Sequence, residues 1–442
     1  MTVAATRIDP HDLAWREPAE VALALAGREG AVAFLSDGGA QGRWSYIACD
    51  PDRVERLEPD DPRDGLDLLR DLLGPRRPPL AGGAPFQGGV VGLAAYEFGA
   101  RLEPLDLPRD PDWPDLVLAR YPTVLAFDHA ARAVHVAGDP DQARSWLQTP
   151  ARPRATGVLA ESFEAERPGE AYEAAVADVV GRIEAGEIFQ ANIARAWAGR
   201  LAEGANPGDV LARLAAASPA PFAAALRLPG LAVISNSPER FLRLEAGPDG
   251  RFGVEARPIK GTRPRGATAT ADAALAAELL ASEKDRAENL MIVDLMRNDL
   301  SRVCERVEAP ELFRAEAYAN VHHLVSTVTG ALAPGRDAAD LLRAAFPPGS
   351  ITGAPKVQAM RVIAAHEPPR GPWCGSLFWA GFDGALDSSV LIRTVAFVER
   401  DGRWRFRAPA GAGIVADSDP GSERLETEAK IAALRRALTE AA

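Results

Sequence analysis

The strands predicted for this chain follow one another in pairs and hairpins instead of alternating with helices. Leu231–Leu244 and Arg251–Ile259 have the residue pattern of two paired strands. Cys374–Val398 and Trp404–Ala408 flank Asp401-Gly402, a dipeptide typical of a tight hairpin turn. A doubly wound sheet would require repeated strand–helix–strand units, which this order lacks. The sequence therefore favours an α+β fold built on large antiparallel sheets.

Composition narrows the class of protein. The 442 residues are 47% hydrophobic, which excludes a disordered chain and suffices for one large domain or two lobes. The formal net charge of −12 argues against a nucleic-acid partner. Cys49, Cys304 and Cys374 have no paired spacing, which fits a reducing compartment and excludes a cysteine-based zinc site. Neither a signal peptide nor a run long enough to span a membrane is visible, so we expect a cytoplasmic protein.

The patterning divides the chain into two sections. Residues 1–150 contain short, loosely patterned strands and one short helix at Asp64–Leu73, and we expect them to form an N-terminal lobe. Thr149–Thr156 is polar and contains prolines, which is typical of a linker. Residues 165–437 are patterned more sharply, with a helix at Ala171–Ala185 and a long helical stretch at Ala271–Arg297. We predict that this second section is the catalytic domain.

Lys260 lies between a predicted strand and a polar turn. Pro258 restricts the backbone just before the lysine, and Gly261 allows close backbone approach just after it. A lysine held on such a constrained backbone suits a covalent amine nucleophile. The alternative is a surface lysine in a Pro/Gly turn, and this segment taken alone favours that alternative.

Two predicted helices present acidic residues three positions apart. Asp285 and Glu288 share one helix face, and Glu423, Glu426 and Lys430 share another. Two solvated faces with weak surface ion pairs are the simpler interpretation. If the two faces converge, four carboxylates would crowd one pocket and would require a cation. A hard divalent ion with oxygen ligands, Mg²⁺ above all, is the natural choice.

Single residues elsewhere suggest further parts of a site. Glu239 follows a proline at a strand end and is a candidate general acid or base. Arg393 lies inside an apolar strand, so it requires either an internal carboxylate or a substrate carboxylate. His323 is an acid/base candidate, although a histidine beside apolar residues is more often structural. Gly411 and Gly413 would let a ligand approach the backbone N–H groups.

Taken together, these segments resemble the chorismate-utilising enzymes. The resemblance covers residues 165–437 strongly and the first section weakly. It implies large antiparallel sheets packed as a sandwich with helices outside, in two interlocked lobes. The motifs that carry it, in chain order, are Gly186–Asn192, Ser237-Pro238-Glu239, Pro258–Thr262, Asp285–Asp299, His322–Ser326, Gly349–Lys356, Ile392-Arg393-Thr394 and Gly411–Ser418.

The resemblance implies how Mg²⁺ and chorismate would be held. Glu288 and Glu426 would be Mg²⁺ ligands, while Asp285 and Glu423 would act through water. The metal would bind the ring carboxylate of chorismate. The residues implied to contact the substrate are Lys430 and the backbone of Gly411, Ala412 and Gly413 at the ring carboxylate, Arg393 and Trp373 at the enolpyruvyl side chain, and Gly261 and Thr262 along the ring.

The resemblance also implies the chemical roles. His323 would lie near C1 of the ring, and Glu239 would protonate the departing C4 hydroxyl. Gln190 stands where the water-adding members of the family have an activating lysine, which argues against water as the nucleophile. Lys260 stands where the members that make anthranilate usually have alanine. We therefore expect lysine to add at C2 and ammonia then to replace it by adding at C4.

The expected product is 4-amino-4-deoxychorismate, the precursor of p-aminobenzoate and folate. The alternative is anthranilate, made by direct attack of ammonia at C2. The lysine must be neutral to attack, and burial or the nearby Arg263 and Arg265 would lower its pKa, whereas the carboxylates would raise it. A catalytically silent effector-binding subunit is disfavoured because every expected acidic and basic site residue is present.

Ammonia is expected to come from a separate glutaminase subunit. None of the three cysteines lies in a Gly-x-Cys-x-Gly nucleophile motif, so we expect no fused glutaminase domain. In related proteins the first lobe can hold tryptophan. Leu35-Ser36 lies where such an effector pocket would fall, so the N-terminal lobe is a candidate effector site.

Overall fold

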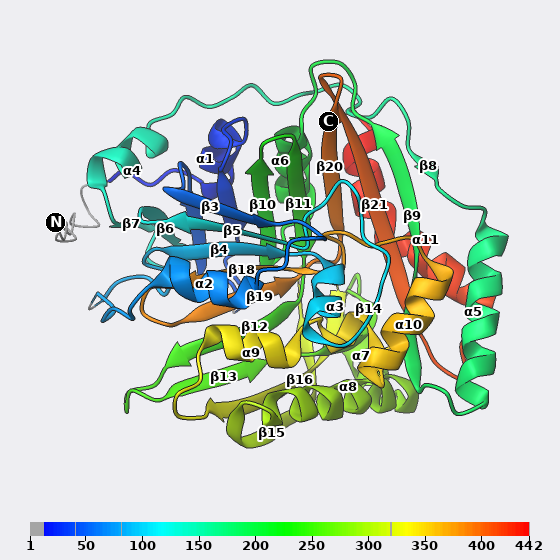
Figure 1. The fold of residues 1–442 in the computed structure, drawn as a ribbon. Helices are drawn as coiled ribbons and strands as arrows, with labels where there is room; N and C mark the ends of the chain where they lie inside the picture. Colours follow the sequence, from blue (N-terminus) through cyan, green and yellow to red (C-terminus); the bar gives the residue numbers. More distant parts are fainter. Residues whose placement is uncertain (1–12, 40, 81, 319–320, 442) are drawn as a thin grey trace.

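Two large antiparallel sheets form the centre of the molecule, and helices cover them (Figure 1). The computed structural model describes residues 13–39, 41–80, 82–318 and 321–441, so the start of the chain, where no signal peptide is predicted, lies outside the described residues. Every strand pair in both sheets is antiparallel. This confirms the predicted α+β class.

The first sheet contains eleven strands of the described chain. Its order is β17 (Gly353–Ala354), β9 (Gln190–Arg200), β21 (Arg403–Ile414), β20 (Thr394–Arg400), β11 (Leu231–Ser237), β10 (Phe222–Leu228), β1 (Val32–Leu35), β2 (Trp44–Ala48), β6 (Val124–Asp128) and β7 (Ala133–Ala137), with β8 (Glu164–Ala165) beside β9.

The second sheet contains ten strands within the same described ranges. Its order is β14 (Ile259–Pro264), β16 (Val321–Leu332), β13 (Phe252–Ala256), β12 (Arg240–Ala246), β19 (Leu386–Val390), β18 (Ser376–Gly381), β4 (Gly89–Ala94), β5 (Leu116–Tyr121) and β3 (Arg53–Leu57), with β15 (Cys304–Ala317) beside β16. Both sheets take strands from residues 1–150 and from residues 165–437, so the two sections are interleaved in space.

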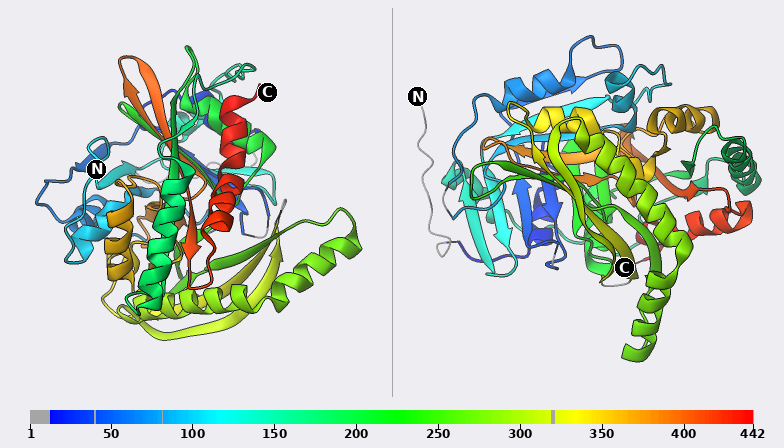
Figure 2. Two further views of the ribbon diagram at one scale, coloured as in Figure 1. Left: turned by 90° about the vertical axis from the view of Figure 1, so that its right-hand side faces the viewer. Right: turned by 90° about the horizontal axis from the view of Figure 1, so that it is seen from below.

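The helices lie around the sheets (Figures 1 and 2). They are α1 (Pro18–Leu25), α2 (Gly65–Leu73), α3 (Gly99–Leu102), α4 (Pro140–Leu147), α5 (Gly169–Glu184), α6 (Pro207–Ala217), α7 (Ala269–Ala281), α8 (Glu283–Ser301), α9 (Ala338–Ala345), α10 (Lys356–His366) and α11 (Pro420–Thr439), with short 3₁₀ turns at Tyr96–Phe98 and Gly349–Ile351. None of the helices in the described residues is long and apolar enough to cross a bilayer.

Alternation along the strands builds two hydrophobic cores. In β4, Val91 and Leu93 belong to the core that the two sheets enclose, whereas Val90 and Ala94 belong to the core beneath the helices. Because neighbouring strand residues point to opposite faces, a strand buried on both sides must be apolar at nearly every position. This explains why β4 is a continuous run of small and apolar residues.

Several predicted segments are divided in the structure, among them Cys374–Val398, which forms β18, β19 and the start of β20. The helical stretch Ala271–Arg297 is broken at Ser282, whose Oγ caps α8 by accepting a hydrogen bond from the backbone N of Asp285 at 3.2 Å. Figure 2 shows α7 extending beyond the body of the molecule from the N-terminal end of α8. The predicted strand Leu231–Leu244 is broken at Pro238-Glu239, because β11 belongs to the first sheet and β12 to the second.

Candidate active site

The site forms where two neighbouring strands leave one sheet and enter the other. Residues 238–239 connect β11 to β12, and residues 391–393 connect β19 to β20. Hydrogen bonds tie the two crossings together: Ser237 Oγ donates to the carbonyl of Val390 at 2.6 Å, and the N–H of Asn236 donates to the carbonyl of Arg393 at 3.0 Å. The crossings therefore place Glu239 and Arg393 on the wall of a cavity between the sheets.

This cavity has a volume of about 760 Å³. It brings together nearly all of the site residues predicted from the sequence. Those on its wall are Glu239, Lys260, Gly261, Thr262, Asp285, Glu288, His323, Trp373, Arg393, Gly411, Gly413, Glu423, Glu426 and Lys430. Ala412 is the exception, because its methyl group is fully buried in the core on the opposite face of β21.

The acidic wall comes from the first two turns of α8 and α11. Burial raises the pKa of Glu288, and the charges of Asp285 and Glu423 raise it further. Burial also raises the pKa of Glu423, with a smaller contribution from Glu426. Burial opposes ionisation of Glu426 as well, but Lys430, whose amine lies 2.6 Å away, brings its pKa below the ordinary value. The two helix faces converge, as the metal hypothesis requires.

The donor chemistry of this wall fits a hard divalent cation. Four carboxylates from two helices face one cavity, and their mutual repulsion is what a cation would relieve. Among the residues that the structure describes, no group of three or more acidic, histidine or cysteine side chains is already arranged to hold a metal ion.

Lys260 lies at an irregularity in strand β14. Ile259 pairs with Val325 and Thr262 with His323, so two residues of β14 oppose a single residue of β16. Gly261 has a φ of +82°, and a Cβ there would lie 2.9 Å from Asp285. This bulge turns the lysine toward the cavity.

The environment of Lys260 lowers the pKa of its amine. Burial is the main cause, and the charge of Lys430 adds to it, while Glu288 and Glu239 oppose the shift. The Nζ atom lies 3.1 Å from the position that a Cβ on Gly413 would take. The expectation that Arg263 or Arg265 would lower this pKa is wrong, because Arg263 pairs with Glu278 and Asp285 and Arg265 pairs with Asp272.

Glu239 has the properties of a proton donor. The residue is 6% exposed, and burial raises its pKa to about 7 although a hydrogen bond from Ser350 and the charge of Lys260 favour ionisation. A carboxyl group with this pKa is partly protonated at neutral pH and suits general acid catalysis.

His323 is held neutral. Burial lowers its pKa to about 4, and the charge of Arg393 contributes in the same direction. Its Nδ1 lies 3.0 Å from Oγ1 of Thr262. A neutral imidazole offers a hydrogen bond to a ligand but not a charge.

Two cations are placed to bind carboxylates of a ligand. Arg393 lines the cavity with a φ of +53°, and it pairs with no carboxylate within the described ranges of the chain. The sequence predicted either an internal carboxylate or a substrate carboxylate as the partner of Arg393, and only the substrate carboxylate is left. Lys430 donates to the carbonyl of Gly411 at 2.8 Å, which holds its amine beside the glycine backbone.

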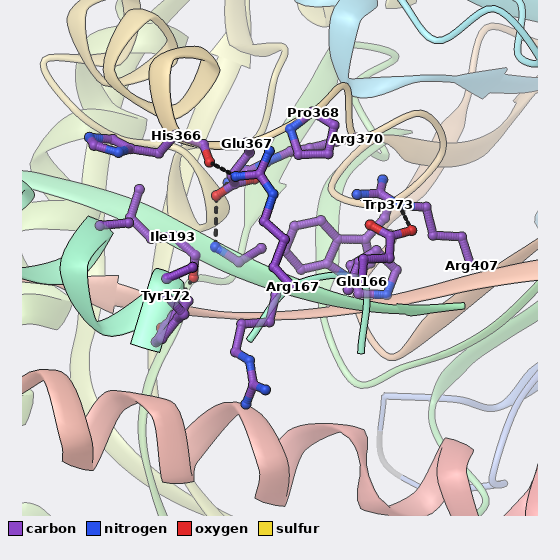
Figure 3. A pocket seen from close by; sticks show the side chains of 16 residues that line it. Glu166, Arg167, Tyr172, Ile193, His366, Glu367, Pro368, Arg370, Trp373 and Arg407 are labelled. Atoms are coloured by element: carbon purple, nitrogen blue, oxygen red, sulfur yellow. Dashed lines mark hydrogen bonds and ion pairs between the residues drawn. The ribbon is translucent and has the colours of Figure 1, made fainter. Parts of the chain in front are cut away.

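A buried arginine, Arg370, lines a small pocket that shares Trp373 with the cavity (Figure 3). Arg370 forms an ion pair with Glu367 at 2.9 Å and donates to the carbonyls of Ile351 and Asn192 at 3.0 and 2.7 Å. Its guanidinium lies 5.0 Å from the centre of the Trp373 ring. Trp373 separates the small pocket in Figure 3 from the cavity and lines both.

The site contains residues that the sequence reasoning did not assign. Ser350, Asn192 and Lys284 line the cavity. Ser350 and Asn192 belong to two of the segments that carry the family resemblance, Gly349–Lys356 and Gly186–Asn192. The sequence therefore pointed to these segments but gave neither residue a role.

The fold and the cavity define an α+β enzyme with a site for a small, carboxylate-bearing substrate, and comparison with known proteins identifies the family. The family model described as chorismate binding enzyme matches residues 32–436. The chain therefore belongs to the chorismate-binding enzyme family.

Individual relatives agree with this assignment. The chain is 43% identical to aminodeoxychorismate synthase component 1 of Klebsiella aerogenes over 357 residues, which cover 78% of this chain and 76% of the relative. It is 39% identical to anthranilate synthase component 1 of Streptomyces coelicolor, with 90% of this chain and 82% of the relative covered. The crystal structure of anthranilate synthase component I from Streptococcus pneumoniae TIGR4 matches with a TM-score of 0.78 and 28% identity, covering 90% of this chain and 93% of that one.

Proposed function

We propose that this chain aminates chorismate at C4 with ammonia and releases 4-amino-4-deoxychorismate. The observation that carries the proposal is the position of Lys260, whose amine faces the cavity beside Gly413 with a lowered pKa. A lysine with a lowered pKa is available as a neutral nucleophile. The 43% identity to a protein named aminodeoxychorismate synthase component 1 supports this choice.

Chorismate would be held by its two carboxylates. Arg393, which has no carboxylate partner in the described chain, would bind the carboxylate of the enolpyruvyl group, with Trp373 beside that group. Lys430 and the backbone at Gly411 and Gly413 would bind the ring carboxylate. These contacts would set the ring between Lys260 and Glu239.

The remaining wall residues would orient the ring. Gly261 and Thr262 lie along the cavity at the bulge of β14, and neutral His323, which contacts Thr262, would face the C1 end. Glu288 and Glu426 would hold Mg²⁺, with Asp285 and Glu423 acting through water. When bound, the ion would neutralise the acidic wall and attract the ring carboxylate.

In the first step, the neutral amine of Lys260 would add at C2. The ring double bonds shift, and the C4 hydroxyl leaves as water after accepting the proton of Glu239, whose pKa of about 7 keeps that proton available near neutral pH. In the second step, ammonia would add at C4, the double bonds would shift back, and the bond to Lys260 would break. The amino group then stands on the carbon that lost the hydroxyl.

Ammonia would come from a separate glutaminase subunit. Three relatives that match 78%, 86% and 83% of the chain are named aminodeoxychorismate synthase component 1, which implies a second component. Free ammonium would replace that partner in an assay.

Product identification tests the proposed function. The chain is incubated with chorismate, MgCl₂ and an ammonium salt, and the products are separated by mass spectrometry. We expect 4-amino-4-deoxychorismate, which becomes p-aminobenzoate when a suitable lyase is added. Anthranilate as the main product would establish the alternative activity, which is favoured by the 39% identity to an anthranilate synthase component 1.

The covalent role of Lys260 is tested separately. Without ammonia, the chain mixed with chorismate should gain the mass of a ring adduct on Lys260, measured on the intact protein. Lys260→Met, which keeps the length of the side chain, should form no adduct. Full amination activity in Lys260→Met would show that ammonia attacks the ring directly.

A further inference from the structure

Arg370 is buried beside the cavity, and no step of the proposed reaction uses it. The residue is 4% exposed. Its guanidinium donates two hydrogen bonds to Glu367, at 2.9 and 3.0 Å, and one each to the backbone carbonyls of Ile351 and Asn192. Because the donors of an arginine form a rigid, planar fork, these four bonds fix the orientation of the guanidinium plane.

Two aromatic rings contact this fixed cation. The guanidinium carbon of Arg370 lies 4.6 Å from the centre of the Tyr96 ring and 5.0 Å from the centre of the Trp373 ring. A cation at this distance over a ring face is attracted by the ring electrons, and the attraction is strongest for tryptophan. Arg370 and Trp373 both line the small pocket of Figure 3, and Trp373 also lines the cavity.

A second set of contacts holds the backbone that leads into Trp373. The carboxylate of Glu97, which is 4% exposed, accepts hydrogen bonds from the N–H groups of Arg370 at 2.7 Å and Gly371 at 3.0 Å. The N–H of Tyr96 donates to the carbonyl of Gly371 at 2.8 Å. The segment before Trp373 is therefore tied to a turn that belongs to residues 1–150.

The orientation of the Trp373 ring matters because its indole N–H has no acceptor. The residue is 3% exposed, and Nε1 has no hydrogen-bond partner among the described residues. Buried donors without a partner are rare, so an oxygen of a bound molecule is the expected acceptor. Only a ring held at a fixed angle can offer this N–H in a constant direction.

We propose that Arg370 is a positioning residue that holds the Trp373 ring at the angle that bound chorismate requires, with Glu97 fixing the backbone of both. Arg370 does not touch the substrate and acts through the ring. The inference rests on the proposed function in that chorismate is the substrate and Trp373 lies beside its enolpyruvyl group. It holds whether amination occurs at C4 or at C2, because both reactions start from the same bound molecule.

The test measures KM for chorismate and kcat at saturating ammonium. Arg370→Lys keeps the positive charge beside Glu367 but loses the planar fork that faces the ring. KM for chorismate should rise about tenfold, the effect of one misplaced hydrogen bond, while kcat changes less than about threefold, because Trp373 does not touch the reacting carbons.

A double-mutant cycle shows whether Arg370 acts through Trp373. Trp373→Leu removes the ring and should raise KM for chorismate at least as much as Arg370→Lys does. The double variant should have the KM of Trp373→Leu alone, because Arg370 then has no ring to hold. Effects of the two changes that multiply, or a wild-type KM in Trp373→Leu, would overturn the proposal.

Arg101→Lys is the matched control. Arg101 pairs with Asp115 and donates to three backbone carbonyls at 2.6, 2.7 and 2.9 Å, but it does not line the cavity. It should leave KM unchanged even where it lowers Tm as much as Arg370→Lys does. An equal rise of KM in this control would reduce Arg370 to a structural role and overturn the proposal.

Should Arg370→Lys fail to fold, Glu97→Gln decides the test. This change turns an NH₂ group toward one of the two N–H groups that the carboxylate now accepts, so the same direction of change in KM is expected. An unchanged KM for chorismate in the variant that folds would overturn the proposal. Anthranilate as the wild-type product would reject the proposed function and leave this test standing.

Discussion

Replacing Glu239 by glutamine should stabilise the folded protein and strongly reduce its turnover. The carboxyl group is 6% exposed, and burial raises its pKa from an ordinary 4.5 to about 7. One pKa unit corresponds to about 1.4 kcal/mol, so ionising Glu239 in the folded protein costs about 3 kcal/mol more than in the unfolded chain. Glutamine keeps the size of the side chain and carries no charge.

The stability gained by this substitution depends on pH, because the pKa of Glu239 is higher in the folded protein than in the unfolded chain. The folded protein holds the proton more tightly than the unfolded chain, so the wild type loses stability as pH rises from about 4.5 to about 7. The free energy of unfolding gained by Glu239→Gln over the wild type should grow from about 2 kcal/mol at pH 6 to about 3 kcal/mol at pH 8. Across 442 residues, 3 kcal/mol raises Tm by roughly 3 °C.

Urea unfolding at pH 6, 7 and 8 measures these differences, and the variant is compared with Glu203→Gln at an exposed turn. Turnover of Glu239→Gln should fall at least about a hundredfold, because the general acid is lost. In the wild type, turnover should decline above pH 7 as Glu239 ionises. A variant that is no more stable than the wild type, or a gain that does not grow with pH, would refute the reasoning.

Two further predictions concern the cation and the glycines of β21. Added MgCl₂ should stabilise the wild type and so raise its Tm, and the gain is about 2.7 kcal/mol at a hundredfold excess of Mg²⁺ over Kd. It should not stabilise Glu288→Gln or Glu426→Gln. An equal rise of Tm in these variants would remove the metal assignment. Gly413→Ala should lower kcat/KM at least about tenfold, because its Cβ would crowd Gln190 and Lys260. Gly181→Ala in α5 is the control, because the added Cβ would have no atom within 4 Å. It should stabilise the protein by about 0.5–1 kcal/mol without loss of activity.

Several features were predictable from the sequence because they depend on local chemistry. The hairpin at Asp401-Gly402 forms as expected, with Arg400 paired to Arg403. The helix predicted at Asp64–Leu73 forms as α2, which begins at Gly65 with Asp64 as its cap. Turns and caps are decided by residues within a few positions of one another, so they can be predicted without tertiary information.

The sequence by itself determined the class of fold and most of the polar residues that line the cavity, since the acidic pairs, Lys260 and Arg393 were all identified from their segments. Only the tertiary structure decided that β11 and β12 belong to different sheets, because the exchange depends on which distant strands are available to pair. It also decided the proton affinities of Lys260 and Glu239. Those proton affinities depend on burial and on charges brought together from α8, α11 and β14. The distance between residues far apart in the chain cannot be predicted from local sequence patterns, because it is set only when the chain folds.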